Sequence, residues 1–76
     1  MARVEPIDLR EKRFNYLPAR FMWRGEQHRI RRVERVWSRP GRGARSPRTY
    51  FRVRCYNDKV FDIFQDVRLN AWYLER

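Results

Sequence analysis

Four arginines recur at every third position in the middle of the chain, at Arg39, Arg42, Arg45 and Arg48. Guanidinium groups bind phosphate oxygens in a bidentate geometry and stay charged at any physiological pH. In a proline-containing stretch that samples the polyproline II conformation, three residues make one turn, so we expect all four groups on one side. Spaced at about 9 Å, they would follow a phosphate backbone, and no acidic residue interrupts them. This pattern predicts a nucleic-acid contact.

The segment that follows extends the pattern. Residues 49–56 alternate, so that Tyr50, Arg52, Arg54 and Tyr56 share the face opposite the apolar residues. The arginines would continue the positive surface, and the tyrosines would offer rings on which bases stack. The alternative interpretation is a solvated linker on which the tyrosines pack.

The positive charge is concentrated in one region. The net charge is +10, from nineteen basic and nine acidic residues, and only Lys12 and Lys59 are lysine. Residues 20–54 contain twelve basic and two acidic residues, whereas residues 1–19 and 55–76 carry net charges of +1 and −1. This segregation predicts an anionic partner for the middle of the chain. Nucleic acid, with DNA favoured over RNA, or an acidic protein would fit.

Residues capable of catalysis are few and isolated. His28 lies among arginines and polar residues, and Cys55 alternates with apolar residues and is expected in the core. Ser38 and Ser46 lie in or beside the basic loop without a neighbouring base. No cysteine, histidine or carboxylate cluster has metal-ligand spacing. The sequence therefore predicts a protein that is not an enzyme, with no metal, no cofactor and no small-molecule substrate.

The chain also lacks signals for membranes or secretion. No stretch approaches the roughly 18 consecutive apolar residues of a membrane span. Residues 1–10 have no apolar core of a secretory signal. The single cysteine cannot form an internal disulfide, which fits a reducing compartment. We expect a cytoplasmic protein without a membrane partner.

The elements that position these residues are expected to be strands. Residues 1–13 alternate charges around few apolar anchors and are expected to form a partly mobile, irregular lead-in. Residues 14–76 are expected to form one all-β domain, a five-stranded antiparallel meander closed into a small SH3-like barrel. Segment 39–48, with two prolines and two glycines, is expected to be an exposed loop. The aromatic residues expected in the core are Phe21, Trp23, Trp37 and Trp72.

Residues 26–37 permit two interpretations. Ile30, Val33, Val36 and Trp37 recur at the spacing of an amphipathic helix. As a strand, the segment fits only if its face switches near Arg31 through a β-bulge or a strong bend. The β-branched and aromatic content and the absence of an N-cap residue favour the bent strand.

The register of the following hairpin is expected to follow its apolar face. A three-residue loop at 57–59 would pair Cys55 with Phe61. It would also place Arg54 opposite Asp62, which would neutralise part of the charge of that arginine.

A series of aromatic anchors runs through the chain. Segment 18–25 reads P-x-x-F-x-W-x-G, and an arginine- and valine-rich strand then ends at Trp37. A basic loop, the sequence RTYFRV at 48–53 and a closing W-x-L at 72–74 follow. Over residues 15–76 this order resembles a small bacterial family of domains of unknown function. Its members occur alone and at the C-terminal end of catalytically inactive Y-family polymerase-like proteins of the damage-induced mutagenesis cassette. The resemblance implies a DNA-repair context and supplies no catalytic residues.

Three functional hypotheses stay open. In the first, the basic region binds the backbone of a nucleic acid. In the second, the protein is an adaptor of a repair or polymerase complex, and its charge steers an acidic partner. In the third, the protein has no nucleic-acid role.

Overall fold

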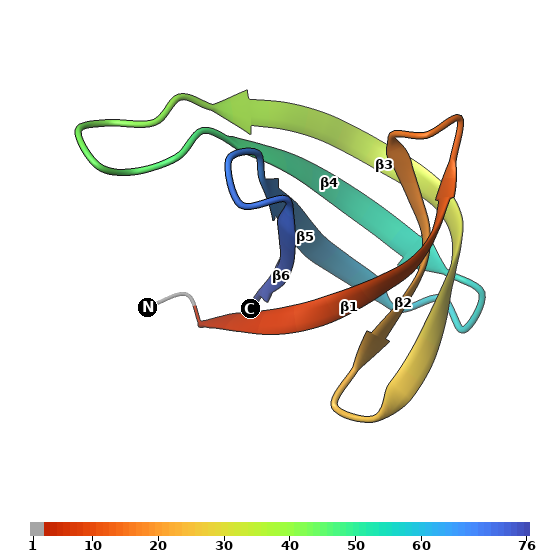
Figure 1. Ribbon diagram of the computed structural model, residues 1–76. Coiled ribbons are helices and arrows are strands. Elements are labelled where there is room, and N and C mark those ends of the chain that lie inside the picture. The colour runs from red at the N-terminus through yellow and green to blue at the C-terminus, as the bar shows by residue number, and fades with distance from the viewer. Residues whose placement is uncertain (1–2) are drawn as a thin grey trace.

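The computed structural model describes residues 3–76 as a closed barrel of antiparallel strands (Figure 1). Each strand pairs with its neighbours in the sequence, and the first pairs with the last. The expected all-β class and small barrel are confirmed. No helix in the described part of the chain is long and apolar enough to cross a membrane. The strands are β1 (Val4–Arg13), β2 (Leu17–Trp23), β3 (Glu26–Arg39), β4 (Arg48–Cys55), β5 (Val60–Asp66) and β6 (Ala71–Glu75).

The N-terminal segment is a strand, so the barrel has six strands instead of the expected five. The expectation of an irregular lead-in over residues 1–13 is wrong for the residues that form β1, and residues 1–2 lie outside the described residues. Ile7 and Leu9 alternate with exposed neighbours and pack against the core. The first half of β1 pairs with β6 and the second half pairs with β2. Ladder hydrogen bonds on both halves compensate for the small number of apolar anchors, which is why the hydrophobic pattern does not reveal this strand.

Strand β3 confirms the bent-strand interpretation of residues 26–37. Its pairing with β4 shifts register between Ile30 and Arg32 and again between Val33 and Arg35. Each bulge adds one residue to the two-residue repeat of a strand. Ile30, Val33 and Val36, of which Val36 is 52% exposed, therefore share one face of a strand at helical spacing, which explains why the sequence pattern permits both interpretations.

The turn between β4 and β5 fixes the register of that hairpin. Cys55 donates its N–H to the carbonyl oxygen of Lys59 at 2.9 Å, so the loop consists of residues 56–58. Asp58 takes the left-handed conformation, with φ 66°, and donates its N–H to the Cys55 carbonyl at 2.9 Å. The side-chain oxygen of Asn57 accepts the N–H of Lys59 at 3.1 Å. An αL residue closing a three-residue loop is a common hairpin geometry, and here Asp58 supplies it.

This register corrects two expected pairings. Cys55 does not pair with Phe61, and Asp62 lies opposite Arg52 instead of Arg54. The expected loop is one residue too far along the chain, so each pairing is displaced by two residues. A displacement by two leaves every side chain on its expected face.

The core fills the barrel interior with alternate residues of the strands. Phe21 and Trp72 are buried in it, as expected, and Trp23 packs half-buried against it. Trp37 is not in the core, because it lies on the outer face of the sheet. The buried core cluster consists of Phe21, Ile30, Phe51, Val53, Cys55, Ile63, Trp72 and Leu74.

Candidate nucleic-acid interface

The arginines of the basic loop meet at the end of the β3–β4 hairpin, which projects from the barrel (Figure 1). Arg39 and Arg48 face each other as the last residue of β3 and the first of β4. Arg42 and Arg45 close a tight turn, in which the Arg45 N–H donates to the Arg42 carbonyl at 2.9 Å. Gly43 takes the left-handed conformation inside this turn, with φ 56°. The spacing of three therefore produces two cross-hairpin pairs, and the expected polyproline II track is wrong because the chain reverses here.

The charge of these four residues, the hairpin arginines, is unmatched within the described chain. No carboxylate in residues 3–76 lies within 4.0 Å of Arg39, Arg42, Arg45 or Arg48. Asp66, the register partner of Arg48 on β5, instead accepts the N–H of Leu69 at 3.1 Å. Other arginines do have carboxylate partners: Arg10 pairs with Asp8, Arg24 and Arg76 with Glu5, Arg31 with Asp58, Arg32 and Arg54 with Glu34, and Arg52 with Asp62.

Below the hairpin arginines, a row of stacked aromatic rings crosses four strands on the outer face of the sheet. Trp37 on β3 stacks on Tyr50 on β4, with ring centroids 5.2 Å apart and planes at 11°. The ring centroids of Tyr50 and Phe64, on β5, lie 4.9 Å apart, and those of Phe64 and Tyr73, on β6, lie 5.2 Å apart. Tyr50 is 0% exposed and Phe64 is 1% exposed. The expectation that Tyr50 offers a solvent-facing ring for a base is therefore wrong.

Two hairpin arginines rest on this aromatic row. The Arg39 guanidinium carbon lies 4.7 Å from the centre of the Tyr50 ring, and that of Arg48 lies 4.6 Å from the centre of Phe64. Arg48 also donates from Nη1 to the Tyr50 hydroxyl at 3.4 Å, and that hydroxyl donates to Glu75 at 3.4 Å. Cation–π contacts and hydrogen bonds restrict the rotamers of long side chains. Contacts within the chain thus hold the base of the hairpin end in place.

The structure adds two residues that the sequence reasoning missed. Trp37 is only half-buried and forms the β3 end of the aromatic row. Arg35 places its guanidinium carbon 5.0 Å from the centre of the Trp37 ring. Arg35 has no carboxylate partner among the described residues. Knowledge of the cross-strand register would identify both residues, since Arg35 lies opposite Arg52 and Trp37 lies opposite Tyr50.

Arg52 and Arg54 lie on the same face of β4, but carboxylates hold them both. Arg52 makes two hydrogen bonds to Asp62, at 2.8 and 3.1 Å. Arg54 donates to Glu34 at 2.8 Å. These hydrogen bonds raise the pKa of both arginines above its usual value, and the bonds from Arg54 and Arg32 lower the pKa of Glu34. The structure therefore separates these two residues from the unmatched hairpin arginines.

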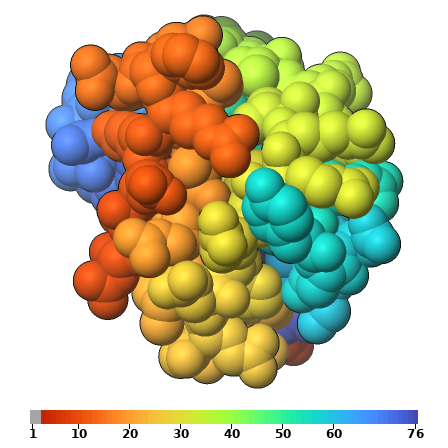
Figure 2. Space-filling model, turned by 90° about the vertical axis from the view of Figure 1, so that its right-hand side faces the viewer, coloured from red at the N-terminus to blue at the C-terminus, as the bar shows by residue number. Residues whose placement is uncertain are grey.

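Tyr56 lies at the other end of the molecule. It follows the last residue of β4, an eight-residue strand that begins at Arg48, so roughly 25 Å separates it from the hairpin end. Figure 2 shows this side, where the β4–β5 turn lies against β3 and the Tyr56 N–H donates to the Arg29 carbonyl at 3.1 Å. Tyr56 is 57% exposed, and the Arg29 guanidinium carbon lies 5.3 Å from the centre of its ring. Tyr56 therefore cannot share a short site with the hairpin arginines.

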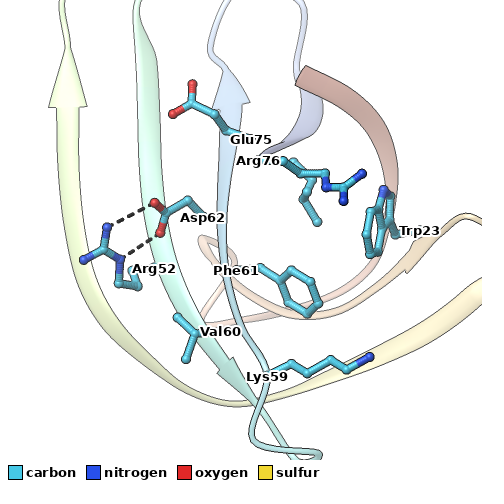
Figure 3. Close-up of a pocket in the computed structure, with 9 residues that line it drawn as sticks. Trp23, Arg52, Lys59, Val60, Phe61, Asp62, Glu75 and Arg76 are labelled. Atoms are coloured by element: carbon cyan, nitrogen blue, oxygen red, sulfur yellow. Dashed lines mark hydrogen bonds and ion pairs between the residues drawn. The ribbon is translucent and has the colours of Figure 1, made fainter. Parts of the chain in front are cut away.

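A separate cavity of about 550 Å³ opens beside the start of β5 and the end of β6 (Figure 3). Trp23 and Phe61 form an aromatic wall, with ring centroids 5.6 Å apart. The Arg52–Asp62 ion pair lies at its edge (Figure 3). Its charged residues have both signs, so the cavity does not concentrate positive charge as the hairpin end does. These charged residues are Arg52, Lys59, Asp62, Glu75 and Arg76.

Two of the residues with catalytic side chains, His28 and Cys55, line one hollow of about 220 Å³, but neither ring nitrogen of His28 has a hydrogen-bond partner in the described chain. His28 is 4% exposed and lies among the rings of Phe21, Trp23 and Phe61, with centroid distances of 5.2, 5.9 and 5.2 Å. Burial lowers the pKa of its imidazole. Cys55 lies in the core, where burial raises the pKa of its thiol. Among the described residues, no three His, Cys, Asp or Glu side chains are grouped to hold a metal ion.

The comparison with protein families assigns the chain to a family without a known activity. A family model described as a domain of unknown function, DUF6504, matches residues 2–75. No curated protein and no solved structure gives a match. The match includes all six strands, with β1 among them. The chain therefore belongs to the DUF6504 family of domains of unknown function.

Proposed function

We propose that this chain is a non-enzymatic nucleic-acid-binding module that holds phosphate groups with its hairpin arginines. The observation that supports this function is the unmatched charge at the end of the β3–β4 hairpin, where four arginines have no carboxylate partner in residues 3–76. Two of them, Arg39 and Arg48, already rest on buried rings. Side chains that are ordered before binding lose less conformational entropy when the ligand arrives.

The expected mode of binding is contact with the backbone. Arginine contacts to phosphate fix position but carry no sequence information, so sequence preference should be weak. Affinity should fall steeply with salt, because each neutralised phosphate releases counterions. The single cysteine fits a cytoplasmic location, and the sequence resemblance supports DNA as the ligand and a role in bacterial DNA repair. It also suggests that related domains act alone or beside an inactive polymerase-like protein.

A second candidate function is that of a protein-interaction adaptor, and the edge of β3 favours it. Strand β3 pairs with β2 only through residues 26–29, whereas residues 30–39 pair with β4 alone. Their other edge is free of strand partners within the described chain. An extended acidic peptide could add to this edge as a further strand and meet the arginines beside it. This adaptor would keep its partner after nuclease treatment.

The test of the proposed function measures binding to a fluorescent single-stranded or duplex DNA at one salt concentration. The test variant replaces Arg39, Arg42, Arg45 and Arg48 with alanine. The control replaces four exposed arginines at the opposite side of the barrel, Arg10, Arg13, Arg29 and Arg31, with alanine. Both variants lose the same charge. We expect the test variant to lose at least tenfold in affinity and the control to lose much less, whereas equal losses would exclude a local site.

A further inference from the structure

We infer that the hairpin end is a discrete pocket for a phosphomonoester, and that it captures the terminal phosphate of a nucleic-acid strand. This inference rests on the proposed function and names the part of the nucleic acid that the site takes. It starts from the shape of the hairpin end. Two adjoining hollows there have volumes of about 100 and 320 Å³ and share Arg39, Pro40 and Arg45. Arg48 and Ser46 complete the first hollow, and Arg42 completes the second.

The loop that forms these hollows is tightly folded. A side chain at Gly41 would overlap the carbonyl oxygen of Arg45 and touch the backbone at Pro47. Val67, in the β5–β6 turn, donates its N–H to the Pro47 carbonyl at 3.1 Å and attaches the loop to the barrel. Such a loop is a built structure, in contrast to the solvated linker that its composition also permits. The folded loop therefore places its arginines around two adjoining hollows.

The concentration of charge selects the kind of phosphate. A phosphodiester inside a strand carries one negative charge, and successive phosphates are spread along the backbone. A phosphomonoester carries a charge of about −1.5 to −2 at pH 7 and has three strong acceptor oxygens. Three arginines line each of the two adjoining hollows, and none of the four has a carboxylate partner among residues 3–76, so the charge matches the compact and more highly charged group. A row of arginines spaced along a line would match the phosphodiester backbone better.

The neighbouring surface favours a nucleic acid as the source of this phosphate. Trp37 lies two residues before Arg39 on β3, which places it about 7 Å along the strand. Its indole is half-buried, stacks on Tyr50 and has Arg35 beside it. A nucleotide whose phosphate occupies the hollow would bring its base within reach of this indole. A phosphorylated amino acid in a peptide has no base to place there.

The test compares oligonucleotides of one sequence in a fluorescence-anisotropy assay. One carries a 5′ phosphate, one a 3′ phosphate, and one no terminal phosphate. A strand lengthened by two nucleotides without a terminal phosphate controls for total charge. We expect at least one phosphorylated end to bind about tenfold tighter than the charge-matched strand. The double variant R39A/R48A should lose this preference, whereas the R10A/R13A control should keep it.

Each outcome separates the two proposals. Equal, salt-dependent binding of all four strands would overturn the terminal pocket and leave the proposed function standing. No salt-dependent binding of any strand would contradict both. A phosphoserine peptide that binds as tightly as the phosphorylated strand would overturn the assignment to a nucleic acid. A preference that R39A/R48A retains would place the pocket elsewhere and overturn the inference.

Discussion

The guanidinium carbon of Arg39 lies 4.7 Å from the centre of the Tyr50 ring, and that ring is 0% exposed. Tyr50 therefore supports the proposed binding surface from below, stacked on Trp37 and tilted against Phe64. An exposed arginine resting on a buried aromatic row links the stability of the outer sheet face to the geometry of the proposed site. Substitutions at Tyr50 can separate the contribution of the ring from that of the hydroxyl group.

Replacing Tyr50 with Leu should reduce both stability and DNA affinity. The leucine keeps apolar volume but removes the ring that stacks with Trp37 and carries Arg39, so the free energy of unfolding should fall by about 1–3 kcal/mol. Affinity should fall severalfold because Arg39 loses its support. Tyr50→Phe keeps the ring and serves as the control, with affinity close to that of the native protein. Urea unfolding and fluorescence anisotropy measure the two effects, and equal affinities for the Leu and Phe variants would contradict the supporting role.

Asp62 should suppress DNA binding in the native protein. Its carboxylate forms two hydrogen bonds with Arg52, on the same face of the sheet as the hairpin arginines. Asp62→Asn would free Arg52, so DNA affinity should rise severalfold and the salt dependence should steepen by about 0.7 to 0.9 for one added phosphate contact. Arg52→Ala should change affinity little, because that charge is already matched. A large loss with Arg52→Ala would show that this arginine contacts DNA despite its partner.

The sequence predicts the β architecture but leaves parts of the site hidden. Clean alternation identifies β4 and its inward face, because one buried face imposes a period of two. The helical spacing in β3 arises from two bulges, which depend on tertiary packing and leave no local signal. Strand β1 depends on hydrogen bonds to two other strands, and a single-strand pattern cannot show this.

The geometry of the proposed site is hidden from the sequence for a similar reason. The spacing of three identifies the four arginines, but their arrangement comes from the reversal of the chain between β3 and β4, which places Arg39 opposite Arg48. Tyr50 alternates as an outward residue and does point outward, yet neighbouring rings and Arg39 cover it. Alternation reveals the face of a residue, whereas its burial depends on cross-strand neighbours. Trp37 is predicted in the core because a small barrel needs aromatic bulk, but the second bulge of β3, between Val33 and Arg35, places it on the outer face.

The conformation of the basic loop should depend on Gly41. Gly41→Ala would force the backbone at Arg45 to move, since the added methyl group overlaps its carbonyl oxygen. Gly43→Ala is the matched control, because it strains a left-handed residue but meets no atom within 4 Å. We expect Gly41→Ala to weaken DNA binding more than Gly43→Ala, with both variants unfolding close to the native temperature. A larger effect from Gly43→Ala would show that the turn, and not the closed loop, positions the arginines.

His28 should make stability depend on pH below its ordinary pKa. Burial among three rings is the main cause that lowers its pKa from 6.5, Glu26 opposes the shift and Lys59 adds to it. The unfolded chain therefore takes up a proton at a higher pH than the folded chain. Stability should be full above pH 6.5 and decrease as pH falls from there towards the lowered pKa of the folded state.

His28→Phe tests this dependence, because a phenyl ring fits among Phe21, Trp23 and Phe61 without a titrating group. Urea unfolding between pH 5.5 and 7.5, approximate limits set by the ordinary histidine pKa, should show a slope for the native protein and a nearly flat response for the variant. Glu5 and Glu34 have lowered pKa values, so their contributions disappear only in stronger acid. An equal slope in both proteins would assign the dependence to another group.

The central claim is that the hairpin arginines bind phosphate, and the salt dependence of DNA affinity tests it most directly. The logarithm of the association constant, plotted against that of the salt concentration, has a slope of about −0.7 per phosphate contact for single strands and −0.9 for duplexes. Replacing Arg39, Arg42, Arg45 and Arg48 with alanine should flatten the slope by about 3. The control R10A/R13A/R29A/R31A should keep the native slope. Equal slopes for the two variants, or an affinity that does not depend on salt, would contradict the claim.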